Sequence, residues 1–526
     1  MSNTGLGVRH ARLTPLAGCL AAALVLVCGH AGATGRPPQI LPVGVATFDS
    51  VRSSDPSARP GWWKRPDPGD IARRWQPAPH ALADIPAGSV VVQNCNDHGS
   101  GSLRQALANA NSGDTIDLTQ LSCSEITLTT GSITFTQSGI TLQGPGSKYL
   151  SISGNDVYTP LVHTGLGRLY VDDLSIEHGM RDGGIYPGRG GCIYGDHVYV
   201  NDSVISSCTA RTEDATYFYR AVGGGVFGYS SVSLYDSSVI DSSAVAPTSE
   251  AWGGGIATYG SASIAHSFIG GNYSTSRGGG AYAHDGLLVS YSTFDSNNAG
   301  TYCGAFCAAG EITIFDSAIS NNQAISAVGG AELYVPYDSP PPTIVNSTIS
   351  GNRSAFAGGI QIIRDNGIYG AHIANSTIAF NHEDASARHG AGLNLYGQAV
   401  TGFDLESTIL SNNTYGPGSN ADDVGGSASI VITGAGNLIG YSTLPVPSDT
   451  ILGQDPLLAP LAFNGGATAT HALLSGSPAI DAGNNTMSEA FDQRGSGYPR
   501  MIGSAPDIGA YELDTDDVIF VNGFET

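Results

Sequence analysis

Acidic and basic side chains gather between positions 172 and 202, where their types could support chemistry. Carboxylates are the oxygen ligands that Ca²⁺ prefers, and a pair of carboxylates at a set separation can hydrolyse a glycosidic bond. Stacked carboxylates could instead repel one another and raise their own pKa values. The candidate Ca²⁺ ligands are Asp172, Asp173, Asp182, Asp196 and Asp202. The candidate bases of the same stretch are His178 and Arg181.

Two of these acids, Asp173 and Asp202, occupy the same position of a repeated segment, and Asp236 follows one repeat later. Later repeats place other residue types at that position: His266, Tyr291, Asp316, Asn346, Asn375 and Glu406. Short polar side chains often bond the nearby backbone at turns, so this drift is typical of a corner. The pattern therefore favours a structural corner over a dedicated catalytic site.

The repeat organises the chain around one serine per copy. Neighbouring copies lie 25 to 34 residues apart, at Ser203, Ser237, Ser267, Ser292, Ser317, Ser347, Ser376 and Ser407. Apolar residues recur three positions before and two positions after these serines. An asparagine recurs five positions after them, at Asn272, Asn297, Asn322, Asn352, Asn381 and Asn412. A period of this length predicts a repeat architecture.

The repeated segments are short and β-branched, and glycines follow them, which favours strands and tight turns over helices. Successive coils would stack at the strand spacing of about 4.8 Å. Stacked asparagines would then pair amide to amide as a structural ladder. A stack of this kind also explains why no single copy could fold alone.

The pattern resembles the right-handed parallel β-helix of the pectate-lyase-like superfold, and its glycine and asparagine elements resemble repeats of polymorphic outer-membrane proteins. The resemblance covers residues 124–450 and implies an all-β fold. Lyases of this fold typically use a basic residue with Ca²⁺ held by carboxylates. It therefore implies Asp173 and Asp202 as catalytic candidates, with Arg181 or His178 as the proton-abstracting group. The Gly-His-Gly motif of related glycosidases and the Arg-x-Pro-x-x-Arg motif of related lyases do not occur.

Residues 1–33 are predicted to be a signal peptide. Arg9 and Arg12 precede an apolar run, and Ala31-Gly32-Ala33 is a small-residue cleavage site. One alternative is a membrane anchor, although the apolar run is short and no stop-transfer flank follows it. The other is a lipoprotein signal at Leu16-Ala17-Gly18-Cys19, although the apolar run lies mostly after that cysteine.

Two further segments precede the coils. Residues 34–88 are Pro-rich and predict a linker or extended arm. Residues 89–123 are predicted to form an N-terminal cap. Their sequence Ser102-Leu103-Arg104-Gln105 is a capping box that predicts a short helix over 102–110.

Residues 451–513 depart from the repeat and carry their own spaced motifs. These are Thr470-His471-Ala472-Leu473-Leu474, Ser477-Pro478-Ala479-Ile480-Asp481-Ala482-Gly483, Asp492-Gln493-Arg494-Gly495, Arg500 and Asp507-Ile508-Gly509-Ala510-Tyr511-Glu512. Together they resemble the choice-of-anchor Q domain of bacterial surface and secreted proteins. The resemblance implies a C-terminal cap module, in which we expect Arg494 or Arg500 to pair with Asp481, Asp492 or Asp507. Residues 514–526 form a short tail.

Charge and cysteine content bound the partners and the compartment. The net charge of −23 argues against nucleic acid and anionic lipid as partners. Six cysteines remain after signal cleavage, and an even number in an exported chain predicts disulfides. Proximity favours Cys95–Cys123, Cys192–Cys208 and Cys303–Cys307. A zinc site at Cys303 and Cys307 is the weaker interpretation, because no second ligand pair follows.

These features predict a secreted or outer-surface protein of a Gram-negative bacterium, monomeric and without an integral membrane segment after cleavage. A long polar surface without a recognisable catalytic motif favours adhesion or binding of a polysaccharide or cell-surface glycan. The alternative is a polysaccharide lyase or glycoside hydrolase acting on an acidic polysaccharide. Ca²⁺ is the single candidate cofactor.

Overall fold

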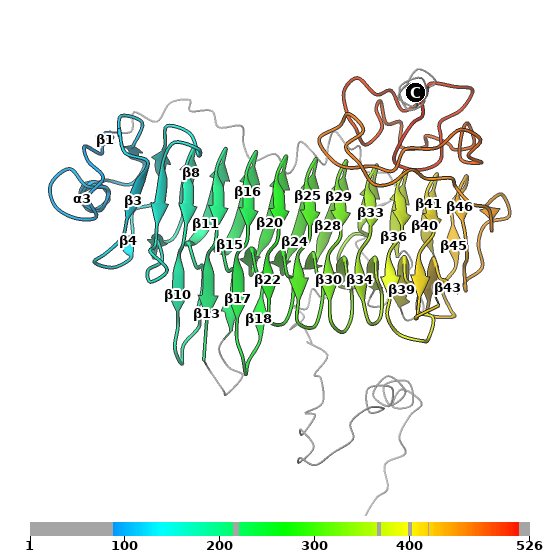
Figure 1. Ribbon diagram of the computed structural model, residues 1–526, viewed down its shortest axis with the longest axis horizontal. Coiled ribbons are helices and arrows are strands. Elements are labelled where there is room, and N and C mark those ends of the chain that lie inside the picture. The colour runs from blue at the N-terminus through cyan, green and yellow to red at the C-terminus, as the bar shows by residue number, and fades with distance from the viewer. Residues whose placement is uncertain (1–87, 214–219, 365–369, 398–401, 419, 515–526) are drawn as a thin grey trace, which may run out of the picture. The chain divides into compact units, whose positions relative to one another are not determined.

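The computed structural model describes residues 88–213, 220–364, 370–397, 402–418 and 420–514. These residues form stacked parallel coils, followed by a C-terminal module without long strands (Figure 1). The predicted signal peptide, almost all of the Pro-rich arm and almost all of the tail lie outside the described residues. Within the described parts of the chain, no helix is long and apolar enough to span a membrane.

From β10 (Met180–Asp182) onward the coils cross three sheets; over the described residues these sheets have 22, 13 and 10 strands, and we call them sheets A, B and C. One coil consists of β19 (Ile256–Thr258) and β20 (Ser261–Ala265) in sheet A, β21 (Phe268–Gly270) in sheet B and β22 (Tyr273–Ser274) in sheet C. The next coil consists of β23 (Ala281–Ala283), β24 (Gly286–Ser290), β25 (Thr293–Asp295) and β26 (Asn298–Ala299). Ile264 lies opposite Val289 in the parallel register, and both are fully buried. The predicted all-β parallel β-helix is confirmed.

Parallel stacking begins before residue 124, inside the predicted cap. β1 (Ser89–Val91) pairs with β2 (Thr115–Asp117), and β2 pairs with β5 (Ile140–Gln143). The predicted cap therefore contributes strands of its own to sheet A, in addition to its helix.

The predicted short helix is present as α3 (Leu103–Asn109), whose apolar stripe is buried. The Ser102 hydroxyl accepts a hydrogen bond from the backbone N–H of Gln105 at 3.3 Å, as an N-cap should. The second half of the capping box is missing among the described contacts, since the Gln105 side chain donates to Asn109 instead.

Two ladders of buried polar side chains connect the coils. At the corner between sheets A and B, the backbone N–H of Ser267 donates to the Ser292 hydroxyl at 3.0 Å, and other coils repeat this bond. At the corner between sheets B and C, Asn272 Nδ2 donates to Asn297 Oδ1 at 3.0 Å. Asn297 Nδ2 in turn donates to Asn322 Oδ1 at 2.9 Å. Each ladder thus satisfies polar groups that no water can reach.

The last copy of the repeat is shifted by one residue from its predicted alignment. Thr408 takes the serine position, because its backbone N–H donates to Asn437 Oδ1 at 3.0 Å. Ser407 instead adopts the left-handed corner conformation, with φ of 49°. Asn413 takes the ladder position, because its Oδ1 accepts from Asn381 Nδ2 at 2.8 Å. The predictions for Ser407 and Asn412 were therefore wrong: the corner residue sets the register, and residue type alone does not reveal it.

The three disulfides join the cysteines that proximity favoured. They are Cys95–Cys123, Cys192–Cys208 and Cys303–Cys307. A cysteine in a disulfide offers no thiolate to a metal, so the pairing of Cys303 with Cys307 speaks against the zinc interpretation.

The C-terminal module lies along the side of the last coils rather than over their end, near β33 (Thr348–Ser350) and β41 (Ile409–Ser411) (Figure 1). Its apolar side chains Leu473 and Ile508 pack with Ile409 of the coils. The Thr348 hydroxyl donates to Gln493 Oε1 at 2.6 Å. The module therefore covers the outer face of sheet B.

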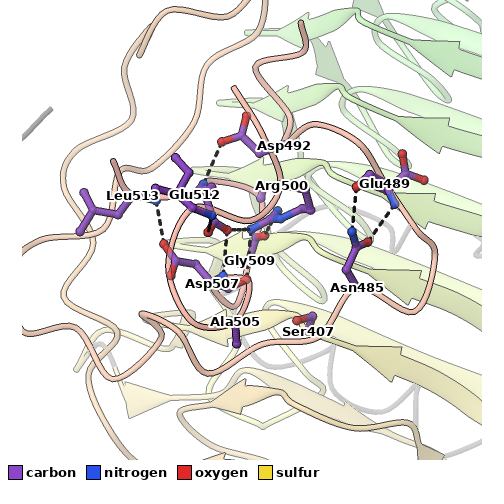
Figure 2. A network of polar contacts seen from close by, with 12 residues as sticks. Ser407, Asn485, Glu489, Asp492, Arg500, Ala505, Asp507, Gly509, Glu512 and Leu513 are labelled. Atoms are coloured by element: carbon purple, nitrogen blue, oxygen red, sulfur yellow. Dashed lines mark hydrogen bonds and ion pairs between the residues drawn. The ribbon is translucent and has the colours of Figure 1, made fainter. Parts of the chain in front are cut away.

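Inside the module, two buried arginines form internal ion pairs. Arg494 pairs with Asp492 at 2.8 Å, as predicted. Arg500 pairs with Glu512 at 2.9 Å, and it also donates to the Asp507 and Gly509 carbonyls (Figure 2). A buried arginine needs several acceptors to offset its lost hydration, so this network is structural.

Candidate functional site

The corner between sheets A and B carries one outward side chain per coil, in a line that we call the corner row. Its members are Asp173, Asp202, Asp236, His266, Tyr291, Asp316, Asn346 and Asn375, all with φ between 45° and 57°. Asp, Asn and His tolerate this left-handed backbone better than most residues. The predicted corner role of this repeat position agrees with these angles.

Three of the predicted candidates lie together at the start of the corner row. Gln143 Nε2 donates to Asp173 Oδ2 at 2.9 Å, and Asn201 Nδ2 donates to Asp172 Oδ1 at 2.7 Å. Burial raises the pKa of Asp202, and the charges of Asp236 and Asp173 raise it further. Like charges therefore accumulate here.

The other acidic candidates lie elsewhere in the fold. Asp196, on β11 (Ile193–Asn201), accepts hydrogen bonds from the Gly167 N–H and the Ser230 hydroxyl. Asp182 ends β10 (Met180–Asp182) of sheet C and accepts from the Gly184 N–H at 2.8 Å. Among the described residues, the groups compact enough for a metal ion are limited to the disulfide-bonded Cys303 and Cys307 with Glu332. The five predicted Ca²⁺ ligands thus do not converge on one point.

The two candidate bases are separated from the catalytic candidates Asp173 and Asp202. His178 adopts a left-handed φ of 50° at the corner between sheets B and C, and its Nδ1 lies 3.2 Å from Asp156 Oδ1. Arg181 lies on β10, beyond that corner and next to Asp182. The whole of β9 (Ser175–Glu177) separates His178 from Asp173. The structure therefore does not bring either base to Asp173 and Asp202.

The later part of the corner row runs beneath the C-terminal module. Burial raises the pKa of Asp316 to about 8, although the hydrogen bond from Asn346 Nδ2 at 3.2 Å opposes this shift. The neighbouring Tyr291 ring stacks on His266, with ring centroids 4.8 Å apart. Asp316 lies covered between coil and module, where burial favours its protonated form.

A second cluster lies where several successive coils enter sheet A, at the N-terminal ends of their strands. It was not predicted from the sequence. We call it the arginine–aromatic face; its members are Arg189, Tyr194, Arg220, Phe227, Trp252, Tyr259, Arg277, Tyr282, Tyr302 and Glu332. Parallel bridges between successive coils align Arg189, Val222, Trp252, Arg277 and Tyr302 in one column. The first four members of the column directly precede a glycine, whereas Tyr302 precedes Cys303.

The arginines of this face lie over aromatic rings. Arg220 lies 4.1 Å from the Trp252 ring centroid and also pairs with Glu250 at 2.8 Å. Arg277 lies 4.7 Å from the Tyr302 centroid. Guanidinium groups held over aromatic faces gain cation–π energy and lose conformational freedom. The arginine side chains of this face are thus held in position before any ligand binds.

Two of these arginines form no direct ion pair with a described residue. Within the described parts of the chain, neither Arg189 nor Arg277 has a carboxylate within 4.0 Å. Burial raises the pKa of Glu332, and the positive charge of Arg277 opposes that rise. Arg189 Nε and Trp252 Nε1 are buried without a hydrogen-bond partner among the described residues. Polar groups in this state are uncommon in folded proteins and favour a missing partner.

A signal for this face is present in the sequence. The residue directly before the glycine turn is Arg189, Trp252 and Arg277 in three copies of the repeat. The recurrence of arginine and tryptophan at this repeat position signals the cluster, whereas the positions of the acidic residues do not.

Comparison with known proteins finds two weakly similar solved structures and no family. No protein-family model matches the chain, and no curated protein matches it. The solved pectate lyase Pel9A shares 16% identity over 82% of this chain and 98% of its own, with a TM-score of 0.36. The PL6 family alginate lyase AlyGC shares 12% identity over 82% of this chain and 58% of its own, with a TM-score of 0.41. These values are too low to transfer an activity, and the choice-of-anchor Q resemblance stays a prediction.

Proposed function

We propose that this protein is an exported, non-catalytic glycan-binding protein whose arginine–aromatic face takes an anionic polysaccharide. One observation carries the proposal. Arg189 and Arg277 lie on this face without a carboxylate partner, in a chain that has 45 acidic and only 22 basic residues. In so acidic a chain, unpaired arginines fixed on one face favour an anionic ligand.

The chemistry of the face suits a sugar polymer that carries carboxylates or sulfates. A guanidinium group offers a planar fork of donors that matches such anions. Partly exposed aromatic rings such as Tyr194 and Tyr302 offer flat apolar surface against which sugar rings can lie. Because the arginines are already held over rings, little conformational entropy remains to be lost on binding.

The overall charge of the chain limits where a polyanion can bind. A net charge of −23 repels it over most of the surface, so attraction depends on these local cations. We therefore expect binding to weaken steeply with salt, since exposed charges are screened beyond about 8 Å at physiological ionic strength.

The separation of the predicted acids from the predicted bases supports a non-catalytic role. Asp173 and Asp202 lie on the corner row, while Arg181 lies on sheet C. Adhesion to a glycan-coated surface would follow from binding on an exported protein. The predicted signal peptide and the three disulfides support the export part of the proposal.

The test uses residues 34–526 and a panel of soluble polysaccharides: polygalacturonate, alginate and neutral dextran. We expect retention of the two anionic polymers and not of dextran. Arg189→Gln and Arg277→Gln should each weaken binding roughly tenfold or more, because a charge-assisted hydrogen bond contributes about 1.5–3 kcal/mol.

The matched control is Arg353→Gln, because Arg353 is an exposed arginine paired with Asp384 outside this face. Its affinity should equal that of the wild type. Wild-type affinity in Arg189→Gln and Arg277→Gln, as well as in the control, would show that this face does not bind the polysaccharide. Release of unsaturated or reducing ends would overturn the non-catalytic role and favour a lyase or a hydrolase.

A further inference from the structure

A pocket of about 300 Å³ opens where the C-terminal module meets the corner row. Its lining consists of Asp236, Ser237, Ser238, His266, Ser267, Phe268, Tyr291 and Thr293 from the coils, with Phe463 and Ala467 from the module. We call it the module pocket. It lies apart from the arginine–aromatic face. That face lies where the chain enters the sheet A strands, whereas the corner row lies where the chain leaves them.

Two columns of side chains from three successive coils form the floor of the module pocket. Asp236, His266 and Tyr291 belong to the corner row. The second column starts the strands of sheet B, because Phe268 pairs with Ser238 on one side and with Thr293 on the other. Parallel stacking therefore brings side chains from three coils to one place.

The module supplies the roof of this pocket and is anchored beside it. The Thr468 hydroxyl donates to the Asp316 carbonyl at 3.2 Å, one residue beyond Ala467. Gln493 Nε2 donates to the Thr468 hydroxyl at 2.9 Å and ties this loop to the rest of the module. The roof is therefore held in place by buried hydrogen bonds.

Aromatic rings are the main apolar surface in the pocket. Phe463 is 74% exposed and Phe268 is 41% exposed, which is high for phenylalanine side chains in a folded protein. The stacked rings of His266 and Tyr291 lie between the coils and the module. Exposed rings around a pocket favour a ligand that lies against aromatic faces.

The polar groups of the pocket are mostly used, with one charged exception. The Ser237 hydroxyl donates to the Tyr235 carbonyl at 2.8 Å, and the Ser267 hydroxyl donates to the Ala265 carbonyl at 2.7 Å. Asp236 is exposed, and its carboxylate has no hydrogen bond or ion pair with any residue that the structure describes. A carboxylate that accepts and does not donate favours a cationic ligand.

The surroundings strengthen the negative potential. Asp202 and Asp173 continue the corner row away from the pocket. The charges of Asp236 and Asp173 raise the pKa of Asp202, so the carboxylates of the row interact. The module arginines Arg494 and Arg500 are already paired with Asp492 and Glu512. Aromatic faces attract cations through their quadrupoles, and they do so most strongly for ammonium groups that are weakly hydrated.

We propose that the module pocket binds an organic ammonium ion, with Asp236 opposite the positive charge and Phe463 and Phe268 against its apolar groups. The ammonium group could come from a quaternary amine or from an amino sugar. This site does not depend on the arginine–aromatic face, so either proposal can fail without the other.

Isothermal titration calorimetry on residues 34–526 tests the ligand class. The charged probes are choline and glucosamine at pH 6.5, and their neutral counterparts are 3,3-dimethylbutan-1-ol and glucose. We expect at least one charged probe to bind and to exceed its neutral counterpart at least tenfold. Tighter binding of choline would indicate a quaternary amine as the ligand, and tighter binding of glucosamine would indicate an amino sugar. Absence of binding by both, or equal binding by the neutral counterparts, would overturn the proposal.

Variants test the location. Asp236→Asn and Phe463→Ser should each weaken binding at least tenfold, while Arg277→Gln should leave it unchanged. The matched control is Asp241→Asn, because Asp241 is also an exposed aspartate with a left-handed backbone, at the opposite corner of the same coil. Unchanged affinity in both Asp236→Asn and Phe463→Ser, with unchanged melting temperatures, would show that the ligand binds elsewhere.

Discussion

Asp316 makes the stability of this protein depend on pH in an unusual direction. Its carboxyl is buried beneath the C-terminal module, and burial raises its pKa from 3.8 to about 8. Between these values the folded state keeps the proton while the unfolded state has lost it. Each pH unit then removes about 1.4 kcal/mol from the free energy of unfolding. The contribution is fully present below pH 3.8 and is lost as the pH rises through 8.

We expect Asp316→Asn to remove this dependence. An asparagine keeps the acceptor for Asn346 and cannot ionise, so the variant should gain stability relative to the wild type as the pH rises. The gain between pH 5 and pH 7 is roughly 3 kcal/mol, from two pH units at the slope above. Urea unfolding at pH 5, 6 and 7 measures it, since other titrating groups cancel in the difference between the two proteins.

The matched control is Asp236→Asn, which replaces an exposed aspartate of the same corner row. A gain of the same size in this control would show that the effect does not depend on the burial of Asp316. A difference between Asp316→Asn and the wild type that does not change with pH would refute the burial argument. A difference that falls with pH would contradict the sign of the linkage.

Three further outcomes follow from the fold. Asn322→Leu should lower thermal stability, because each polar group left unpaired in the ladder costs about 1–3 kcal/mol; equal melting temperatures would count against the ladder. A chain that ends at residue 454 should associate in size-exclusion chromatography, because Ile409 and Leu438 would lose their apolar cover; a monomer as stable as the full chain would contradict this. Thermal melts with Ca²⁺ and with chelator should agree, because the predicted ligands do not converge; a Ca²⁺-dependent rise that Asp173→Asn/Asp202→Asn abolishes would restore the metal site.

Much of the fold could be read from the sequence because each coil contributes the same residue type at the same position. Ser292 and Asn297 recur in neighbouring copies, and they hold neighbouring coils together by the same hydrogen bonds. Repetition turns a tertiary contact into a sequence pattern, so the ladders and the parallel stacking were predictable. The corner row was also predictable, because most of its residues are Asp, Asn or His, which tolerate a left-handed backbone better than other types.

Prediction failed where one coil departed from the pattern. In the last copy Thr408 and Asn413 hold the ladder positions, one residue beyond the predicted Ser407 and Asn412. Only the backbone conformation of Ser407 shows where that corner lies.

The sequence by itself determined the stacked β architecture, its ladders and its cysteine pairs, because these depend on residues that recur or lie near one another. Tertiary structure alone decided the module pocket and the partners of the arginines. Phe463 lines the same pocket as His266 because the module folds back along sheet B, which joins segments without a common period. The repeat places Arg189 and Arg277 in one column, but the sequence does not show which side chains lie against them. Their positions follow from how the whole chain packs its apolar faces, which no short stretch of sequence encodes.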